Sequence, residues 1–449
     1  MLSPNFILKI IGLTVYNQSV LTLLWLGVLA TAILKGLNQP RVLLGLYFSL
    51  SIINPQSSLS LFSGLPLMKI MILLSLASLI INQNQAYFKF PGLFVVFFFF
   101  IICSGLSYVA AVDPGLASKR FSEFNKIFFV CILTLAVLVT REDYDFLHRI
   151  IVYSFYYLIL KTLAETQTMG RWYAVQGPGG WIGDSNDWGI AIAMFLPFVY
   201  VEVIKAKTLA MKVIHSLAGI STLLALTFTS SRGAFLATVA GCLVLLVTEA
   251  KRTKALLVGL MILMVVAVYI PESYMDQVRS IFESSDYIEN AWQGELETEE
   301  YSGAERVWNW KLAKRMMDDF PFSGVGWGNY VSMKSKYDLE PEPTVAHSTW
   351  FQIGAEAGYT GLIVFVFMLL LAFRSLLQTW LTGRQQEDPW LILNARCLAA
   401  GLMAFCVGAT FISREYSDLL FCYIVMTAAM PMLQVPDTVV PLSKSPKEL

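Results

Sequence analysis

The sequence is poor in charged residues. Asp, Glu, Lys and Arg make up 14% of its 449 residues, whereas soluble proteins average about 25%. Hydrophobic residues make up 56% of the chain and its mean hydropathy is +0.61, which excludes a soluble globular protein. The formal net charge is zero, so the electrostatic basis for a nucleic-acid partner is missing.

Metal-binding residue types are also scarce. The chain has three histidines, and its six cysteines all lie inside apolar runs without the spacing of metal ligands. We therefore expect inert, buried cysteines, no metal ion and no cofactor. No internal repeat or low-complexity linker divides the sequence, so residues 1–449 are treated as a single polytopic membrane domain.

Long apolar runs recur along the whole chain. Many approach the roughly 20 residues that a helix needs to cross a hydrocarbon core of about 30 Å. They lack the alternation of membrane-barrel strands. The runs lie at residues 18–34, 41–53, 66–82, 93–111, 125–140, 146–163, 187–203, 213–229, 233–249, 255–270, 348–373, 391–412 and 417–433. Because run 41–53 is short, we expect it or its neighbour to be re-entrant or interfacial. The sequence thus predicts an all-α integral membrane protein with about 12 transmembrane helices, in a range of about 12–14.

Lys and Arg residues predict the orientation of these helices. They gather in the connections near 205–212, 251–254 and 374–384, which we place in the cytoplasm. The outward-facing connections are then 164–186, 230–232, 271–346 and 413–415.

The longest outward connection, 271–346, is predicted to be one large periplasmic insertion that contains helices. Residues 304–317 form an amphipathic pattern, with Val307, Trp308, Leu312 and Met316 on one stripe. Its tryptophans also suit a membrane interface. Pro321 ends this helix, and the glycines of residues 324–328 predict a turn.

His347 stands where the polar insertion gives way to a new apolar run. Histidine is the side chain whose unperturbed pKa lies nearest physiological pH. At the positive end of a helix that begins near residues 344–348, the ring stays neutral and can accept a proton. His347 is therefore a candidate general base, although the position also suits a histidine that caps the helix or binds a headgroup. Gly354, Gly358 and Gly361 follow at a spacing typical of close helix packing.

Two arginines are candidates for binding an anion. Arg232 follows Ser230 and Ser231 at a predicted outward-facing helix N-terminus, where free amides beside a guanidinium suit a phosphate. Snorkelling of Arg232 to the membrane surface is the alternative. Arg306 is the first cation of the amphipathic helix and follows Glu305, where an ordinary surface charge is the alternative.

Three more cations are weaker candidates for phosphate or headgroup contacts. Arg414 lies in the outward turn between the last two apolar runs and could instead pair with Glu415. Lys119 and Arg120 lie on an outward connection, where few cations are expected, and contact with anionic lipid would explain them.

The remaining polar candidates favour structural roles. Asp184 and Asp187 could hold a divalent cation, but helix capping before the next apolar run is the preferred interpretation. His148 and His215 lie near the predicted cytoplasmic side and receive no role.

Three motifs resemble one membrane enzyme family. His347-Ser348, with Gly358 after nine residues and Gly361 after two more, resembles the H-[NSQ]-x9-G-x-x-[GTY] pattern of the O-antigen ligases. Residues 229–234 resemble the arginine turn of the O-antigen ligase and polymerase superfamily, and residues 321–328 resemble its glycine turn. Residues 182–187 are similar to the exosortase-associated O-glycosylation ligase branch. The resemblance covers most of residues 180–430.

This resemblance implies a GT-C-type membrane glycosyltransferase in the bacterial inner membrane. Such enzymes transfer a glycan from undecaprenyl diphosphate to the lipid A-core on the periplasmic side, without a metal ion. By position, His347 would deprotonate the acceptor hydroxyl, and Arg232 and Arg306 would hold the diphosphate. The expected partners are the undecaprenyl-diphosphate-linked glycan donor, the lipid A-core acceptor and membrane lipids.

Other functions remain open from the residues alone. An O-antigen polymerase and a protein O-glycosylation ligase belong to the same superfamily. The sequence does not indicate whether the glycan acceptor is lipid A-core, a protein or a second glycan. A membrane transporter is the alternative from a different class. It would place ionisable residues near the bilayer midplane, whereas most apolar runs here have uncharged interiors.

Overall fold

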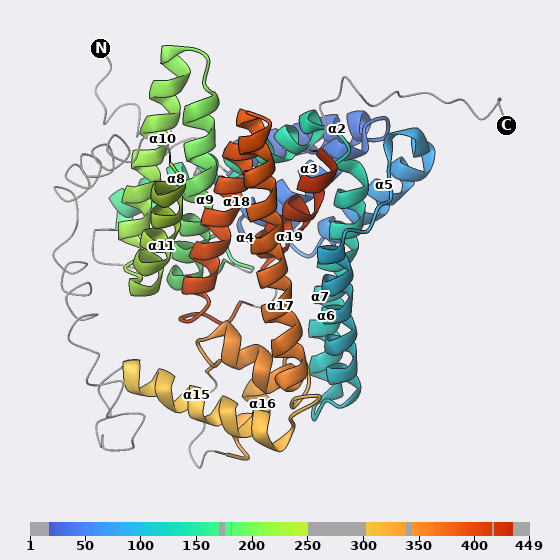
Figure 1. Cartoon of the computed structure of the whole chain (residues 1–449), viewed down its shortest axis with the longest axis vertical. Coiled ribbons are helices and arrows are strands. Elements are labelled where there is room, and N and C mark those ends of the chain that lie inside the picture. Colours follow the sequence, from blue (N-terminus) through green and yellow to red (C-terminus); the bar gives the residue numbers. More distant parts are fainter. Residues whose placement is uncertain are drawn as a thin grey trace.

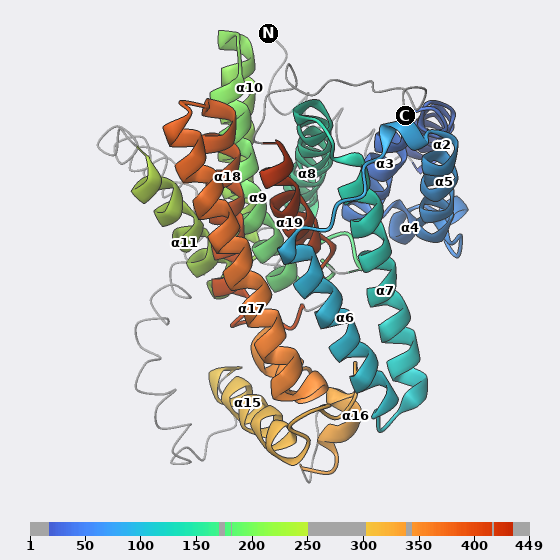
Figure 2. The same cartoon turned by 45° about the vertical axis from the view of Figure 1, so that its right-hand side comes forward.

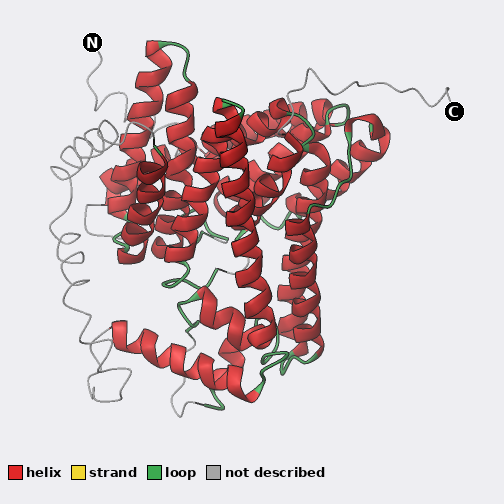
Figure 3. Ribbon diagram, viewed as in Figure 1, coloured by secondary structure: helices red, strands yellow, loops and turns green. Residues whose placement is uncertain are grey.

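The computed structural model describes residues 18–169, 176–180, 182–249, 302–337, 344–414 and 417–433. Within these ranges the regular structure is helical, apart from one β-bridge between Gly179 and Ile182 (Figure 3). The predicted all-α class is therefore confirmed. The predicted span at 255–270 and residues 271–301 and 338–343 of the predicted insertion lie outside the described residues.

The helices follow the chain in this order: α2 (Gln18–Gly36), α3 (Pro40–Ile53), α4 (Pro55–Ser58), α5 (Leu67–Ile81), α6 (Gly92–Val109), α7 (Pro114–Val137), α8 (Arg141–Met169), α9 (Ser185–Lys205), α10 (Leu209–Phe228), α11 (Arg232–Thr248), α15 (Ser302–Asp319), α16 (Tyr330–Lys334), α17 (Thr349–Gln385), α18 (Pro389–Gly408) and α19 (Asp418–Ala429). Short 3₁₀ turns cover Ser60–Phe62, Gln83–Gln85 and Met430–Leu433.

A helix covers every predicted apolar run within the described ranges. Six of these helices, α2, α6, α9, α10, α17 and α18, are long and apolar enough to cross a membrane. Shorter apolar helices occupy Pro40–Ile53, Leu67–Ile81, Arg232–Thr248 and Asp418–Leu433. The total of about 12 spans and the GT-C type remain predictions.

The bundle has a buried centre and an apolar perimeter. In both α9 and α18 the most apolar stretch is 72% buried, against 11% for α2 and 22% for α10. The perimeter helices expose large apolar side chains, such as Leu34 (70% exposed) and Leu209 (78% exposed). Exposing this area to water would cost roughly 25 cal/mol per Å², so these side chains face lipid. The chain is a multi-pass membrane protein.

Helices α15 and α16 lie across one end of this bundle (Figures 1 and 2). The amphipathic helix predicted at 304–317 is α15. Val307, Leu312 and Met316 of its predicted stripe are buried. Trp308 is not part of the buried face, because it is 42% exposed. Asn309 is buried on this face instead, and its backbone carbonyl accepts a hydrogen bond of 2.9 Å from the Tyr330 hydroxyl.

Candidate functional site

The segment before His347 is fixed by side chains from three helices. Lys334 of α16 donates to the Thr344 hydroxyl at 2.9 Å, and Asn309 of α15 donates to the same oxygen at 3.5 Å. The backbone amide of Ala346 donates to the Gln352 side chain of α17 at 3.0 Å. These contacts hold the chain on both sides of Val345 as it approaches the histidine.

The segment after His347 is fixed by the turn between α18 and α19. The Thr349 amide donates to the Ala409 carbonyl at 2.7 Å, and the Thr349 hydroxyl donates to the Ile412 carbonyl at 2.7 Å. His347 itself is half-buried and has a φ of 51°. A left-handed backbone costs an L-residue roughly 1–2 kcal/mol. Such conformations persist where neighbours hold them, and they are frequent at functional sites.

Gly358 divides α17 into two helical segments. Its φ of 69° and ψ of −176° are not helical, so the chain bends between the short segment that begins at Thr349 and the long segment that ends at Gln385. The Tyr359 amide donates to the Pro321 carbonyl at 2.8 Å instead of to its own helix. Gly358 is thus required by its backbone conformation, and it is also closely packed, because a Cβ there would lie 2.6 Å from the Pro321 carbonyl oxygen. Gly354 also packs closely, since an added Cβ there would lie 2.6 Å from the Met317 sulfur of α15.

The predicted glycine turn caps the short segment of α17. Helix ends leave carbonyl groups without intrahelical donors, and here the Val325 amide donates to Ala355 at 2.9 Å while the Gly326 amide donates to Glu356 at 3.2 Å. Gly324 has a φ of 65°, and a Cβ there would lie 2.3 Å from the carbonyl carbon of Glu356. Only glycine permits this approach.

The glycine turn also joins α17 to α6 and α7. Trp327 is fully buried, and its ring centroid lies 5.8 Å from that of Phe100 in α6 and 5.3 Å from that of Phe124 in α7. The Val112 amide, between α6 and α7, donates to the Val325 carbonyl at 3.2 Å. The turn is thus a junction between the N-terminal helices and the histidine-bearing segment.

Arg232 is the first residue of α11. The Ser231 hydroxyl caps this helix by accepting from the Ala234 amide at 3.3 Å, and it donates to the Asn186 side chain of α9 at 2.8 Å. Ser230 has a φ of 52°, so the arginine turn contains a left-handed residue, as His347 itself is. Ser231 is therefore the N-cap of α11, which begins where the sequence predicts a helix N-terminus.

Arg306 of α15 is half-buried and lies close enough to Arg232 for their charges to interact. Burial and the charge of Arg232 lower the pKa of Arg306, while Glu305 and Asp184 raise it. Arg232 and Arg306, which are 74 positions apart in the chain, are therefore brought together at this end of the bundle.

His347 belongs to the same electrostatic cluster. Burial lowers the pKa of His347, and the positive charge of Arg306 lowers it further. Asp184 and Glu305 oppose this shift by raising the pKa. A lowered pKa keeps the imidazole neutral at neutral pH, the state in which it can accept a proton.

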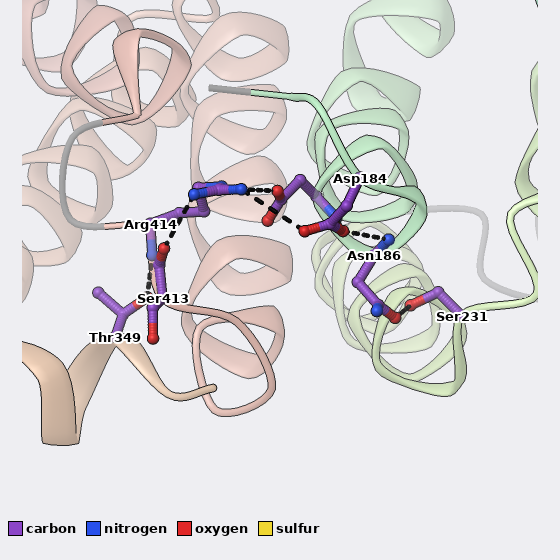
Figure 4. A network of polar contacts seen from close by, with 7 residues as sticks. Asp184, Asn186, Ser231, Thr349, Ser413 and Arg414 are labelled. Carbon is purple, nitrogen blue, oxygen red and sulfur yellow. Dashed lines mark hydrogen bonds and ion pairs between the residues drawn. The ribbon is translucent and has the colours of Figure 1, made fainter. Parts of the chain in front are cut away.

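Arg414 is held by carboxylates. It forms an ion pair with the buried Asp187 and lies 3.5 Å from the second oxygen of Asp184 (Figure 4). Its backbone amide donates to the Thr349 hydroxyl at 3.0 Å. Asp184 caps α9 by accepting from the Asn186 amide at 2.8 Å, which confirms the preferred capping interpretation for Asp184, whereas Asp187 lies inside the first turn of α9 and pairs with Arg414 instead. The alternative partner predicted for Arg414, Glu415, lies outside the described residues.

This network joins the N-termini of three helices, because Arg414 reaches α9 and α17 while Ser231 joins α9 to α11 (Figure 4). Helix N-termini carry partial positive charge. Arg232 and Arg306 add positive charge to this end of the bundle, where the carboxylates of Asp184, Asp187 and Glu305 also lie.

Of the two other predicted cations, Arg120 lies beside the glycine turn. Lys119 and Arg120 are exposed on α7. Arg120 pairs with Glu123 at 3.4 Å. Its aliphatic stem packs against Gly328, because a Cβ on that glycine would lie 2.5 Å from the Arg120 Cγ. Neither cation is among the charges that shift the pKa of His347.

Sequence reasoning missed Gln352 and Glu356, both buried in the short segment of α17. A signal was present, because a carboxylate inside an apolar run is expensive unless it is hydrogen-bonded. Lys334 was also missed; it is 2% exposed and its charge acts on His347. In the described part of the chain, no group of three His, Cys, Asp or Glu side chains has the geometry to hold a metal ion.

Comparison with known proteins identifies two families. Residues 20–177 match a family of unknown function (DUF5935), and no curated protein matches the chain. Residues 217–366 match the family described as O-antigen ligase. That range contains Arg232, Arg306 and His347, together with the glycine turn and Gly358. Residues 217–366, about a third of the chain, are therefore similar to the O-antigen ligase family.

Proposed function

We propose that this protein is an O-antigen ligase of the bacterial inner membrane. It transfers a glycan from undecaprenyl diphosphate to the lipid A-core on the periplasmic side. The observation that supports the proposal is that Arg306 lies within electrostatic range of Arg232 and also of His347, although the three residues come from separate elements. All three lie in the range that matches the O-antigen ligase family.

Arg232 and Arg306 bind the diphosphate of the donor. Two guanidinium groups this close repel each other, and an anion between them relieves that repulsion. Their planar forks match phosphate oxygens in a bidentate manner. As the bond between glycan and diphosphate breaks, negative charge grows on the leaving group, and both arginines stabilise that charge.

His347 acts as the general base. Its neutral imidazole takes the proton of the acceptor hydroxyl, whose oxygen forms the new bond to the anomeric carbon. The bond between that carbon and the diphosphate oxygen breaks, and undecaprenyl diphosphate leaves with the electron pair. A placed base of this kind contributes roughly 10²–10⁴-fold in rate.

The test uses the full chain reconstituted in lipid vesicles with an undecaprenyl-diphosphate-linked glycan. Lipid A-core, a peptide and a second lipid-linked glycan are offered together, and mass spectrometry identifies the product. We expect glycan on the lipid A-core, and a His347→Ala variant that inserts normally but loses roughly 10²–10⁴-fold in rate. Val345→Ala is the matched control, because Val345 is two positions away and 38% exposed. Transfer by His347→Ala at the wild-type rate would overturn the role of the base.

Arg232→Lys tests the diphosphate site. A point charge cannot replace the bidentate fork, so we expect a higher donor KM. Arg384→Lys is the control, since Arg384 lies near the far end of α17 over the Trp380 ring. Equal donor use by Arg232→Lys and wild type would refute the assignment.

The alternative functions give different products in the same reaction. Glycan joined to the second lipid-linked glycan would identify a polymerase. Modified peptide would identify a protein O-glycosylation ligase. Solute flux without any glycan transfer would identify a transporter.

A further inference from the structure

Glu356 is a buried carboxylate that the proposed chemistry does not use. It is 1% exposed and lies two residues before the bend at Gly358. Its side chain accepts from the Gly328 amide at 2.7 Å and from the Tyr330 amide at 3.4 Å. It also accepts from the Gln352 side-chain amide, one helical turn earlier. Because all three groups present hydrogens, the site is built for a carboxylate, which only accepts.

Gln352 passes this contact on to the backbone beside His347. Its nitrogen is directed to Glu356, so its oxygen is the atom left to accept from the Ala346 amide, at 3.0 Å. Ala346 directly precedes His347. The carboxylate therefore fixes which way the Gln352 amide points, and that orientation creates the acceptor for the Ala346 amide.

The conformation of His347 needs such support. Its φ of 51° is unfavourable for an L-residue by roughly 1–2 kcal/mol. On one side it is held by the Thr349 contacts to the turn between α18 and α19. On the other side Gln352 holds Ala346. Without the Ala346 bond the backbone can relax towards an ordinary conformation, and the imidazole then turns away from Arg306.

We infer that Glu356 and Gln352 are positioning residues that hold His347 in its left-handed conformation. The inference rests on the proposed role of His347 as the base. The glycine turn then also supports the base, because the Gly328 amide holds the Glu356 carboxylate that orients Gln352.

Two single variants disrupt this chain of contacts without changing side-chain size much. Glu356→Gln replaces one accepting oxygen with an amino group, so the side chain cannot accept from both Gly328 and Gln352. Gln352→Glu places a second carboxylate against the first. We expect either variant to lower kcat by about 10- to 100-fold, because a displacement of about 1 Å costs on the order of 100-fold. The donor KM should stay close to wild type, because the arginines are untouched.

The double variant that exchanges the two side chains provides the sharpest test. In Glu356→Gln/Gln352→Glu, the new carboxylate at position 352 accepts from Ala346 and from the new amide at position 356. The oxygen of that amide accepts from Gly328. The main contacts are restored with the charge moved by one helical turn, so kcat should recover to within about fivefold of wild type. Gln386→Glu, in the exposed turn after α17, is the control for the charge that the single variant Gln352→Glu adds.

A second measurement reports on the ring without requiring activity. Diethyl pyrocarbonate modifies accessible neutral imidazoles, and mass spectrometry locates the product. His148 and His215 are 1% and 2% exposed, so they serve as unreactive internal references. We expect His347 to react several-fold faster in both single variants, and at the wild-type rate in the exchanged pair.

The outcomes separate this inference from the proposed function. If His347→Ala is active, the base itself is misassigned. If His347→Ala is inactive while both single variants keep wild-type kcat and wild-type His347 reactivity, the positioning role is refuted and the base stands. Loss of kcat in the single variants without recovery in the exchanged pair also refutes it. If a single variant fails to insert, the exchanged pair and Gln352→Met, which removes both contacts without adding charge, decide the question by the same readouts.

Discussion

Replacing Gly358 with alanine perturbs the bend on which the placement of His347 depends. The φ of 69° and ψ of −176° lie in a region that glycine alone populates, and an L-residue there costs roughly 1–3 kcal/mol. A Cβ would lie 2.6 Å from the Pro321 carbonyl oxygen and 2.9 Å from the Phe322 carbonyl carbon. These are backbone atoms, so the chain itself must move.

That movement also weakens a hydrogen bond. The Tyr359 amide donates to the same Pro321 carbonyl at 2.8 Å, a bond worth about 0.5–1.5 kcal/mol. The loss of chain entropy in the unfolded state offsets about 0.4–1 kcal/mol. The net cost to the bend is about 0.5–4 kcal/mol, which corresponds to roughly 2-fold to 10³-fold in the equilibrium for local opening.

Hydrogen exchange measured by mass spectrometry reads this opening directly. In Gly358→Ala, peptides that contain the amides of Val325, Gly326 and Tyr359 should exchange faster by that factor, and glycan transfer should fall with it. The control is Gly27→Ala, because Gly27 lies within α2 and an added Cβ there has no atom within 4 Å. Exchange in Gly358→Ala that equals wild type, with full transfer activity, would refute the bend as the feature that places His347.

Three further predictions concern the charges and caps around the site. The base works in its neutral form, so the acid limb of kcat/KM follows the pKa of His347. Glu305 raises this pKa and Arg306 lowers it, so Glu305→Gln should move the acid limb to lower pH and Arg306→Gln should move it to higher pH. Rates measured from about pH 5 to 8 test both shifts, and shifts in the same direction would contradict the electrostatic cluster. Ser231→Ala should lower stability by about 0.5–2 kcal/mol in thermal unfolding in detergent, and an unchanged midpoint would reject the cap. Arg414→Gln leaves a buried carboxylate without its cation and should cost about 1–3 kcal/mol; a midpoint as high as wild type would show that the ion pair contributes nothing.

The sequence predicted the helices well because hydropathy is a local property. The apolar runs and the caps at Asp184 and Ser231 could be read directly, since each depends on residues within one turn of the chain. The candidate residues Arg232, Arg306 and His347 were also found by local context. Their meeting could not be predicted, because no local pattern records which distant elements fold together.

The bend at Gly358 could not be predicted for a different reason. A glycine at this spacing is equally consistent with helix packing and with a break in the helix. Periodicity cannot separate the two, because the break depends on the approach of Pro321 from another element. Arg414 is similar, since its partners Asp184 and Asp187 lie more than 200 positions away in the chain.

The burial of Trp327 bears on how the chain can be divided. Two family matches, residues 20–177 and 217–366, suggest a division of the chain into two separately expressed modules. Yet Trp327 belongs to the second range while its ring lies among Phe100 and Phe124 of the first. A fragment limited to residues 217–366 would expose this indole, because it would lack α6 and α7, against which the glycine turn packs. The family boundaries are therefore not cutting points, and swaps between relatives should exchange α6, α7 and the glycine turn together.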